Sequence, residues 1–209
     1  MTQEDEAGLG LRERKKRETR VALSRATIAL CVRRGWDDVT VEDIAAAANV
    51  SVRTFRNYFS GKAEAIADGH LERMTRIADS LRAREADEPL WDSIVHAVLA
   101  RFVPRDESGA EAPPDQRWAD GLRLMLAEPA LQGEVAKANA AAQEALTLAI
   151  AERTGTDPAR DVYPRLVAAV VGAGSAVAVE YCLRADPPAS LEPVLREVFD
   201  RLAAGLPTP

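Results

Sequence analysis

Residues 40–59, TVEDIAAAANVSVRTFRNYF, decide how this chain is interpreted. Thr40 places a side-chain oxygen ahead of an apolar helical pattern, and Asp43 follows three residues later; both features are typical of a helix start. Asn49 interrupts the pattern, and Asn tolerates the left-handed conformation that often ends a helix. Ser51 then offers a second helix cap. The stretch therefore predicts two short helices joined by a tight turn.

The second of these helices has two different faces. It is expected to run for about eight residues, or about 12 Å, which is long enough to lie across a DNA major groove. Phe55 and Phe59 are four residues apart, so one face can bury both rings. The outer face is left to Val52, Arg53, Arg56 and Asn57. Two core helices of an ordinary all-α bundle would show the same bare pattern, so the neighbouring residues have to decide.

Three neighbouring features favour a helix-turn-helix that binds DNA. The basic run RERKKRETR begins at Arg12, Tyr58 and Phe59 close the second helix, and Ser-Gly-Lys follows at residues 60–62. Together with Thr-Val-Glu-Asp-Ile-Ala, Asn-Val-Ser and Thr-Phe, these features resemble the DNA-binding domain of the TetR (tetracycline-repressor) family of transcriptional regulators. The resemblance covers residues 17–74, and the remainder matches only in its helix pattern. It implies a ligand-responsive regulator, usually a repressor, that binds a palindromic operator as a dimer.

Helical periodicity runs through the rest of the chain, without strand-like alternation. We therefore expect an all-α protein of about nine helices. Residues 1–10 are expected to form a mobile acidic tail and residues 11–70 a three-helix N-terminal helix-turn-helix head. Residues 71–206 are expected to form a larger helical body for effector binding and dimerisation. With 209 residues, of which 47% are apolar, the chain is large enough to bury a core.

The net charge of −6 is unevenly distributed. Residues 11–62 contain twelve basic and six acidic side chains, a net charge of +6, and the rest of the chain contains 15 basic and 27 acidic side chains, a net charge of −12. Such asymmetry points to one part that faces nucleic acid and one acidic body.

DNA phosphates are held by cationic and hydroxyl groups, whereas a few other side chains read base edges. By resemblance to the family, the phosphate contacts fall to residues at or next to helix ends, namely Thr40, Ser51, Tyr58 and Lys62. The basic run upstream can add a phosphate-contacting arm, although such runs are also common as solvated helix surface. That arm would consist of Arg14, Lys15, Lys16 and Arg17.

The same resemblance places base reading at Val52, Arg53, Thr54, Arg56 and Asn57. Arg is suited to bidentate hydrogen bonds with guanine and Asn with adenine, and the methyl groups of Val and Thr can contact thymine. Two positions depart from the family pattern, since Arg56 stands where the family often has Tyr and Asn49 where it usually has Gly. Arg56 can either read guanine or hold a phosphate.

The last two expected helices differ in character. Residues 163–183 are apolar on nearly every face and include Gly172 and Gly174, which suits a helix buried all round with another backbone nearby. Residues 191–206 carry a single apolar stripe. The resemblance implies that both helices pair with their copies in a four-helix bundle; the alternative for the first is an internal core helix. The expected interface consists of Val170, Gly174, Val177, Val194, Leu195, Val198 and Leu202.

An effector pocket is expected inside the body, as the resemblance implies. Aromatic and apolar residues that could line it, or simply form core, are Trp91, Trp118, Leu122, Met125 and Val171. The long basic first helix is similar to that of a TetR subgroup with acyl-CoA or other lipid-like effectors, so we expect a small apolar or lipid-like molecule. The partners are thus double-stranded DNA, a second copy of the chain and this effector, and we expect no cofactor.

Other classes of protein have weaker support. An all-α enzyme has only His70 and His96 as bases near neutral pH, and neither has a motif partner, so no catalytic or metal-binding residue is assigned. A DNA-binding regulator without an effector also remains open. The acidic body argues against a membrane-surface protein. The N-terminus lacks an apolar signal core, and no apolar run of about 18 residues is free of charge, so we expect a cytoplasmic protein without a membrane partner.

Overall fold

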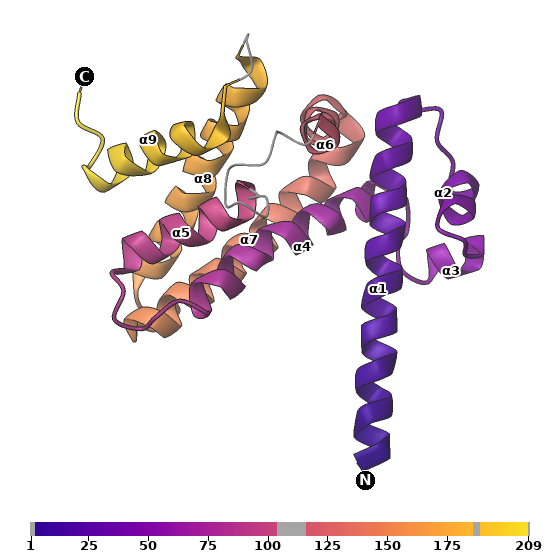
Figure 1. Cartoon of the computed structure of the whole chain (residues 1–209), viewed down its shortest axis with the longest axis horizontal. Coiled ribbons are helices and arrows are strands. Elements are labelled where there is room, and N and C mark those ends of the chain that lie inside the picture. Colours follow the sequence, from indigo (N-terminus) through magenta and orange to yellow (C-terminus); the bar gives the residue numbers. More distant parts are fainter. Residues whose placement is uncertain (1–2, 104–115, 186–188, 209) are drawn as a thin grey trace, which may run out of the picture. The chain divides into compact units, whose positions relative to one another are not determined.

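The computed structural model describes residues 3–103, 116–185 and 189–208 (Figure 1). Within these residues the chain forms helices and no strands, which confirms the expected all-α fold. The nine helices of the described ranges are α1 (Gln3–Arg34), α2 (Val41–Ala47), α3 (Val52–Arg56), α4 (Lys62–Arg82), α5 (Leu90–Phe102), α6 (Gln116–Ala127), α7 (Pro129–Thr154), α8 (Val162–Arg184) and α9 (Leu191–Ala203).

The expected N-terminal tail is wrong as far as residues 3–10 are concerned, because α1 already begins at Gln3. Glu, Gln, Ala and Leu are good helix formers, and acidic residues near the first turn interact favourably with the helix dipole. Acidity at a chain end therefore suits a helix start as well as it suits a tail.

The chain divides into two compact units. Unit 1 consists of Met1–His70 and Asp120–Val135, and unit 2 of Leu71–Ala119 and Ala136–Pro209. We expected every residue after 70 to belong to the body, but residues 120–135 belong to unit 1. The reason is that Met125 and Leu131 are buried in the same apolar core as the helix-turn-helix.

The predicted caps of the helix-turn-helix are confirmed. The Asp43 amide donates a hydrogen bond to the Thr40 hydroxyl at 3.1 Å, and the Thr40 amide donates to the Asp43 carboxylate at 3.0 Å, which completes a capping box for α2. Hydrogen bonds from Thr40 and the nearby Arg34 guanidinium lower the pKa of Asp43. Asn49 takes the left-handed conformation, with φ of 53°, and so ends α2 as its residue type predicted.

Helix α3 is shorter than expected. Ser51 caps it, with the Thr54 amide donating to the Ser51 hydroxyl at 3.0 Å. It ends at Arg56 because the following turn tightens: the Asn57 amide bonds the carbonyl of Thr54, and the Tyr58 amide bonds that of Phe55. Such three-residue spacing is usual where a helix closes its last turn.

The core of unit 1 is built around two phenylalanines. Phe55 and Phe59 are 0% and 1% exposed, and their ring centroids lie 5.8 Å apart. Leu23 and Leu30 from α1 and Ile44 from α2 belong to the same buried cluster. Helices α1 and α4 also approach closely, since a Cβ atom on Gly69 would lie 2.2 Å from the Ser24 hydroxyl oxygen. The small side chains at this crossing let α4 lie against α1 beside the helix-turn-helix.

In unit 2, α9 packs on α8 and α5. Leu195 and Phe199 of α9 are buried, and the Phe199 ring lies 5.8 Å from that of Trp91 on α5. A Cβ atom on Gly174 of α8 would lie 2.9 Å from a methyl carbon of Leu202, so glycine permits this close packing.

The turn between α4 and α5 is held by charge-assisted hydrogen bonds within unit 2. The Arg153 guanidinium donates to the carbonyl oxygens of Arg84, Glu85 and Glu88. Hydrogen bonds from Arg84, Ser93 and His96 lower the pKa of Glu88 to about 2. The carboxylate therefore stays ionised and keeps these contacts.

We expect Phe59→Ala to destabilise unit 1 by about 3–5 kcal/mol, because it leaves a cavity opposite Phe55. Urea-induced unfolding followed by circular dichroism would measure the loss. Arg56→Ala is the matched control, since this side chain is exposed a few residues earlier and should change stability by less than about 0.5 kcal/mol. Equal effects of the two substitutions would contradict the assignment of the core.

Candidate nucleic-acid interface

The outer face of α3 carries the charge expected of a reading surface. Arg53, Arg56 and Asn57 are exposed, whereas Phe55 on the opposite face is completely buried. Neither arginine forms an ion pair within the described part of the chain. Both guanidinium groups are therefore available to an external acceptor.

The other two expected reading residues are less accessible. Val52 is half-buried and packs against the core of unit 1. The Thr54 hydroxyl lies 2.8 Å from that of Ser51 and takes part in the cap of α3. Val52 and Thr54 can therefore offer only methyl groups to DNA. The side chains of α3 and its cap that can form hydrogen bonds with bases are Arg53, Arg56 and Asn57.

Two of the expected phosphate-contact hydroxyls also have partners inside the chain. The Thr40 hydroxyl donates to the Asp43 carboxylate at 2.7 Å, and Ser51 serves the cap of α3. Tyr58 is half-buried, with its ring centroid 6.5 Å from that of Phe59. These residues therefore stabilise the ends of α2 and α3, and they lie next to the exposed side of α3.

Lys62, which we expected to contact a phosphate, has partners inside the chain. Its ammonium group donates to the carbonyl oxygens of Trp36 and Val39, the latter at 3.0 Å, and lies 4.3 Å from the centre of the Trp36 ring. The side chain therefore joins the start of α4 to the loop before α2. Its position at a helix start gave no indication of these acceptors, which lie more than twenty residues earlier in the chain.

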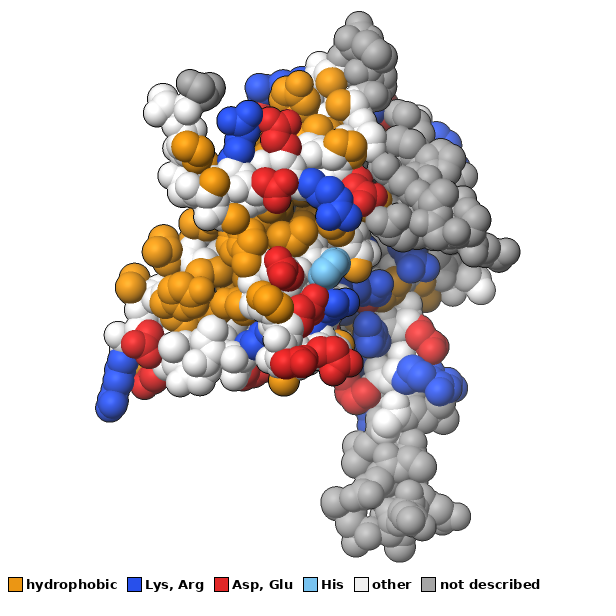
Figure 2. All heavy atoms as spheres, turned by 60° about the vertical axis from the view of Figure 1, so that its left-hand side comes forward, with side chains coloured by type: hydrophobic (Ala, Val, Ile, Leu, Met, Phe, Trp, Pro, Cys, Tyr) orange, Lys and Arg blue, Asp and Glu red, His pale blue; other side chains and the backbone are white. Residues whose placement is uncertain are grey.

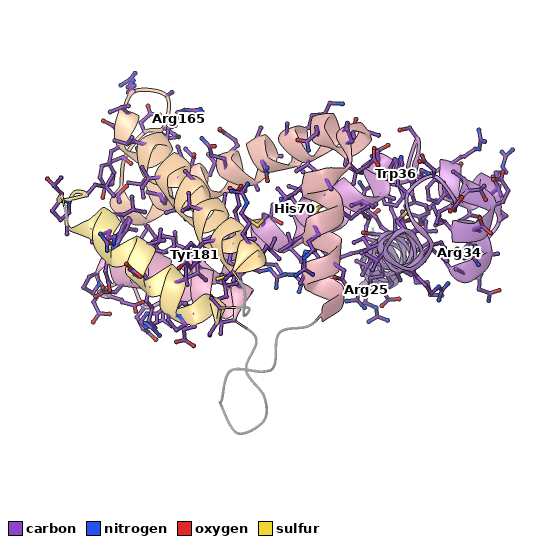
Figure 3. The ribbon with its side chains drawn as sticks, turned by 90° about the horizontal axis from the view of Figure 1, so that it is seen from above. Arg25, Arg34, Trp36, His70, Arg165 and Tyr181 are labelled. Atoms are coloured by element: carbon purple, nitrogen blue, oxygen red, sulfur yellow. The ribbon has the colours of Figure 1, made fainter. Side chains whose placement is uncertain are left out.

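The basic arm lies on the N-terminal part of α1, which extends past α2 and α3 (Figure 1). Arg14, Lys15, Lys16 and Arg17 are all exposed. Arg14 lies 3.6 Å from Glu18, but exposed pairs of this kind contribute little and exchange readily for a phosphate. Arg25 and Arg34 add two more exposed cations further along α1 (Figure 3).

Sequence reasoning missed Arg20, which positions the interface. Its guanidinium group binds the Asp68 carboxylate through two hydrogen bonds of 2.8 and 2.6 Å, and it lies 4.9 Å from the centre of the Phe59 ring. The hydrogen bond with Asp68 raises the pKa of Arg20. One side chain of α1 thus holds both α4 and the residue that closes the helix-turn-helix. The two partners are 48 residues apart, and no local signal in the sequence links them.

The expected dimer interface needs correction at two positions. Gly174 and Leu195 are buried within the chain itself, because α9 covers this side of α8. Val170, Val194, Val198 and Leu202 are half-buried, and Val177 is 58% exposed. The apolar side chains that α8 leaves uncovered are Val162, Tyr163, Leu166, Val177 and Tyr181.

The expected pocket residues do not form one group. Trp91 and Val171 belong to unit 2, whereas Leu122 and Met125 pack against the core of unit 1. The side chain of Trp118 lies outside the described residues. Periodicity marked these positions as apolar, but it could not tell the two cores apart. The Trp91 indole nitrogen is buried and has no acceptor among the described residues.

Comparison with known proteins identifies the family of this chain. Residues 23–67 match the family described as "Bacterial regulatory proteins, tetR family", and residues 88–207 match the "MftR C-terminal domain". The transcriptional regulator TcmR of Streptomyces glaucescens is 32% identical over 186 residues, which cover 86% of this chain and 80% of that protein. The chain belongs to the TetR family of transcriptional regulators.

Further relatives agree with TetR membership. The putative mycofactocin biosynthesis regulator MftR of Mycobacterium tuberculosis is 32% identical over 197 residues, covering 92% of this chain and 93% of that protein. The fold is similar to that of FadR from Thermus thermophilus, a TetR-family repressor solved with lauroyl-CoA (TM-score 0.57, 20% identity, 91% of this chain and 96% of that chain). As a TetR-family member, the chain is a ligand-responsive, DNA-binding transcriptional regulator.

We expect Lys62→Met to lower the stability of unit 1 by about 1.5–3 kcal/mol, because two backbone carbonyls lose a charged donor. DNA affinity should fall in parallel, but the slope of log K against log salt concentration should stay unchanged. A Lys62 that contacts a phosphate would instead reduce that slope by about 0.9, with little loss of stability. Fluorescence anisotropy between 50 and about 200 mM salt separates the two roles.

Proposed function

We propose that this TetR-family regulator represses transcription by placing α3 of each of two subunits in the major groove of a palindromic operator. The observation that carries the proposal is the division of α3 into a buried Phe55 side and an exposed side with Arg53, Arg56 and Asn57. A helix held by one face and cationic on the other suits insertion into the groove. A protein bound there blocks access to the promoter.

Base reading is assigned to the polar side chains of that exposed side. Arg53 and Arg56 each offer a planar fork that suits guanine, and Asn57 suits adenine. Phosphate contacts are assigned to the basic arm on α1, residues 14–17. Contacts with phosphates do not depend on the DNA sequence. Such a split makes α3 responsible for specificity and α1 for much of the affinity.

The homodimer is proposed to form through the uncovered side of α8. Val162 is 76% exposed, Val177 is 58% exposed and Tyr181 is 61% exposed. Hydrophobic side chains gather in the part of unit 2 that holds α8 and α9 (Figure 2). Arg165 and Tyr181 mark the two ends of α8 (Figure 3). A second copy, related to the first by a two-fold axis, would cover this surface. The same axis would present two helix-turn-helix units to the two halves of a palindrome.

The composition of α8 permits one other explanation of its exposed side chains. Among the described helices it alone is long and apolar enough to cross a membrane, by length and composition only. About a third of that window is already buried inside the chain. Burial of one side by α9 and of the other by a second copy accounts for an all-apolar helix without a membrane.

The effector is proposed to bind in unit 2 and to be a small molecule with a large apolar part. One structural relative supports this class, the lauroyl-CoA complex of Thermus thermophilus FadR. As a DNA-binding regulator, the protein is proposed to act in the cytoplasm.

We expect Arg53→Ala and Asn57→Ala each to relax base preference at one or two operator positions, by about 1–3 kcal/mol. Selection from a random DNA library followed by competition binding measures the change. Lys15→Ala is the matched control, because an exposed arm residue should weaken all sequences alike. If Arg53→Ala lowers affinity for operator and random DNA equally, base reading is not its role.

We expect Val177→Asp to produce monomers with poor operator affinity, because a charge would be buried at the two-fold interface. Sedimentation velocity reports the oligomeric state. Leu126→Asp is the control, since Leu126 on α6 is exposed to the same extent as Val177, 58%, but belongs to unit 1. An unchanged dimer in the first variant, or monomers in both, would contradict the placement of the interface.

A further inference from the structure

The turn between α3 and α4 carries an acid that has no part in the proposed DNA contacts. Glu64 lies in the first turn of α4, and its carboxylate accepts two hydrogen bonds from Ser60. One comes from the backbone amide and one from the hydroxyl, both at 2.7 Å, and both lie at the exposed surface of unit 1. The sequence had instead indicated a cation, Lys62, as the group that meets DNA at this helix start.

The local backbone explains why an acceptor is needed at residue 64. The first helical hydrogen bond of α4 runs from the Ala65 amide to the carbonyl of Gly61, and a glycine has no side chain with which to cap the helix. Glu64 reaches back over the turn and accepts from Ser60 instead, much as the acid of a capping box does. Glutamine can supply the same oxygen, so the cap and the charge of Glu64 can be separated.

The carboxylate lies near the end of the proposed reading helix. Ser60 follows three residues after Asn57, which caps the C-terminal end of α3, so their Cα atoms are at most about 11 Å apart. When α3 lies in the major groove, which is about 12 Å wide, its ends are near the phosphate backbones that flank the groove. Charges interact over about 10 Å at 0.1 M salt, so the carboxylate and these phosphates repel each other.

Two cations beside the same turn are bound to acceptors within unit 1. Lys62 donates to two backbone carbonyls of the loop before α2. Arg20 binds the Asp68 carboxylate through hydrogen bonds of 2.8 and 2.6 Å. The charged group that the start of α4 presents at the surface is therefore the carboxylate of Glu64.

We propose that Glu64 limits the affinity of the regulator for DNA by repelling the phosphate backbone at the end of α3. Its charge opposes the attraction that the basic arm, residues 14–17, supplies. Because binding to random sequences depends almost entirely on phosphate attraction, this repulsion keeps such binding weak. The base contacts of α3 then decide where the protein stays bound. This inference rests on the proposed placement of α3 in the groove and adds a repulsive residue to it.

Glu64→Gln tests the proposal, because it removes the charge and keeps an oxygen that can accept from Ser60. Fluorescence anisotropy with the full chain compares a fragment selected from a random DNA library with a random fragment of the same length. At about 50 mM salt the variant should bind both fragments about three- to tenfold more tightly than the wild-type chain. The gain should shrink at about 200 mM salt, because screening weakens the repulsion. Unchanged or weaker binding of both fragments would overturn the proposal.

A second readout separates repulsion from a purely structural role. Glu64→Gln should melt at a slightly lower temperature, because a carboxylate interacts favourably with a helix start, whereas its DNA affinity should rise. A residue that acts only as a cap would lower stability and affinity together. Glu64→Asp keeps the charge on a shorter side chain, so it should bind DNA within twofold of the wild-type chain even if it melts lower. A gain in affinity for Glu64→Asp equal to that for Glu64→Gln would contradict a role of the charge.

Asp200→Asn is the matched control for net charge. Asp200 is an exposed acid on α9 of unit 2, so its loss changes the charge of the chain by the same amount. This variant should bind both fragments within twofold of the wild-type chain. An equal gain in the two variants would show that net charge alone is responsible and would overturn the assignment to Glu64.

The two fragments also keep this inference separate from the proposed function. A wild-type chain that binds both fragments equally, and a Glu64→Gln variant that binds both more tightly, would count against base reading by α3 alone. A wild-type chain that prefers the selected fragment, with no gain in the variant, would count against the role of Glu64 alone. A chain that binds neither fragment, with or without the substitution, would contradict both.

Discussion

Burial of Phe55 and Phe59 against α1 is the constraint on which the DNA-facing surface depends. Helix α3 has five residues, far too few to be stable without its surroundings. Its orientation therefore comes from packing, and once the Phe55 side is buried, the helical period leaves Arg53 and Arg56 outside. Arg20 reinforces this arrangement because it lies over the Phe59 ring and binds Asp68 at the same time. The exposed cations are thus fixed by apolar contacts on the opposite side of a very short helix.

Local features of unit 1 could be predicted because their causes are local. A hydroxyl followed three residues later by a carboxylate forms a capping box wherever the backbone starts a helix, and Thr40 with Asp43 does so here. Asn49 ends α2 in the left-handed conformation because few other residues tolerate it. The helical period alone indicated that both phenylalanines face the same side. All three inferences depend only on residues within a few positions of one another in the sequence.

Contacts between distant segments could not be predicted in the same way. Periodicity shows that a helix has a face to bury, but it does not show which surface covers that face. Leu195 and Gly174 were expected at a subunit interface, yet α8 and α9 of one chain bury them together. Met125 was expected in the body, yet it joins the core of the helix-turn-helix. Lys62 had a suitable position for a phosphate, and only the fold reveals the carbonyls of Trp36 and Val39 as its acceptors.

Helix α4 contributes residues to both units. It begins in unit 1 at Lys62, beside the helix-turn-helix, and ends in unit 2 at Arg82. A ligand changes a conformational equilibrium only by the difference between its affinities for the two states, typically about 1–3 kcal/mol. An effector bound in unit 2 can act on unit 1 through a segment that both units share. Helix α4 is such a segment, because it carries Lys62 and Asp68 in unit 1 and continues to Arg82 in unit 2.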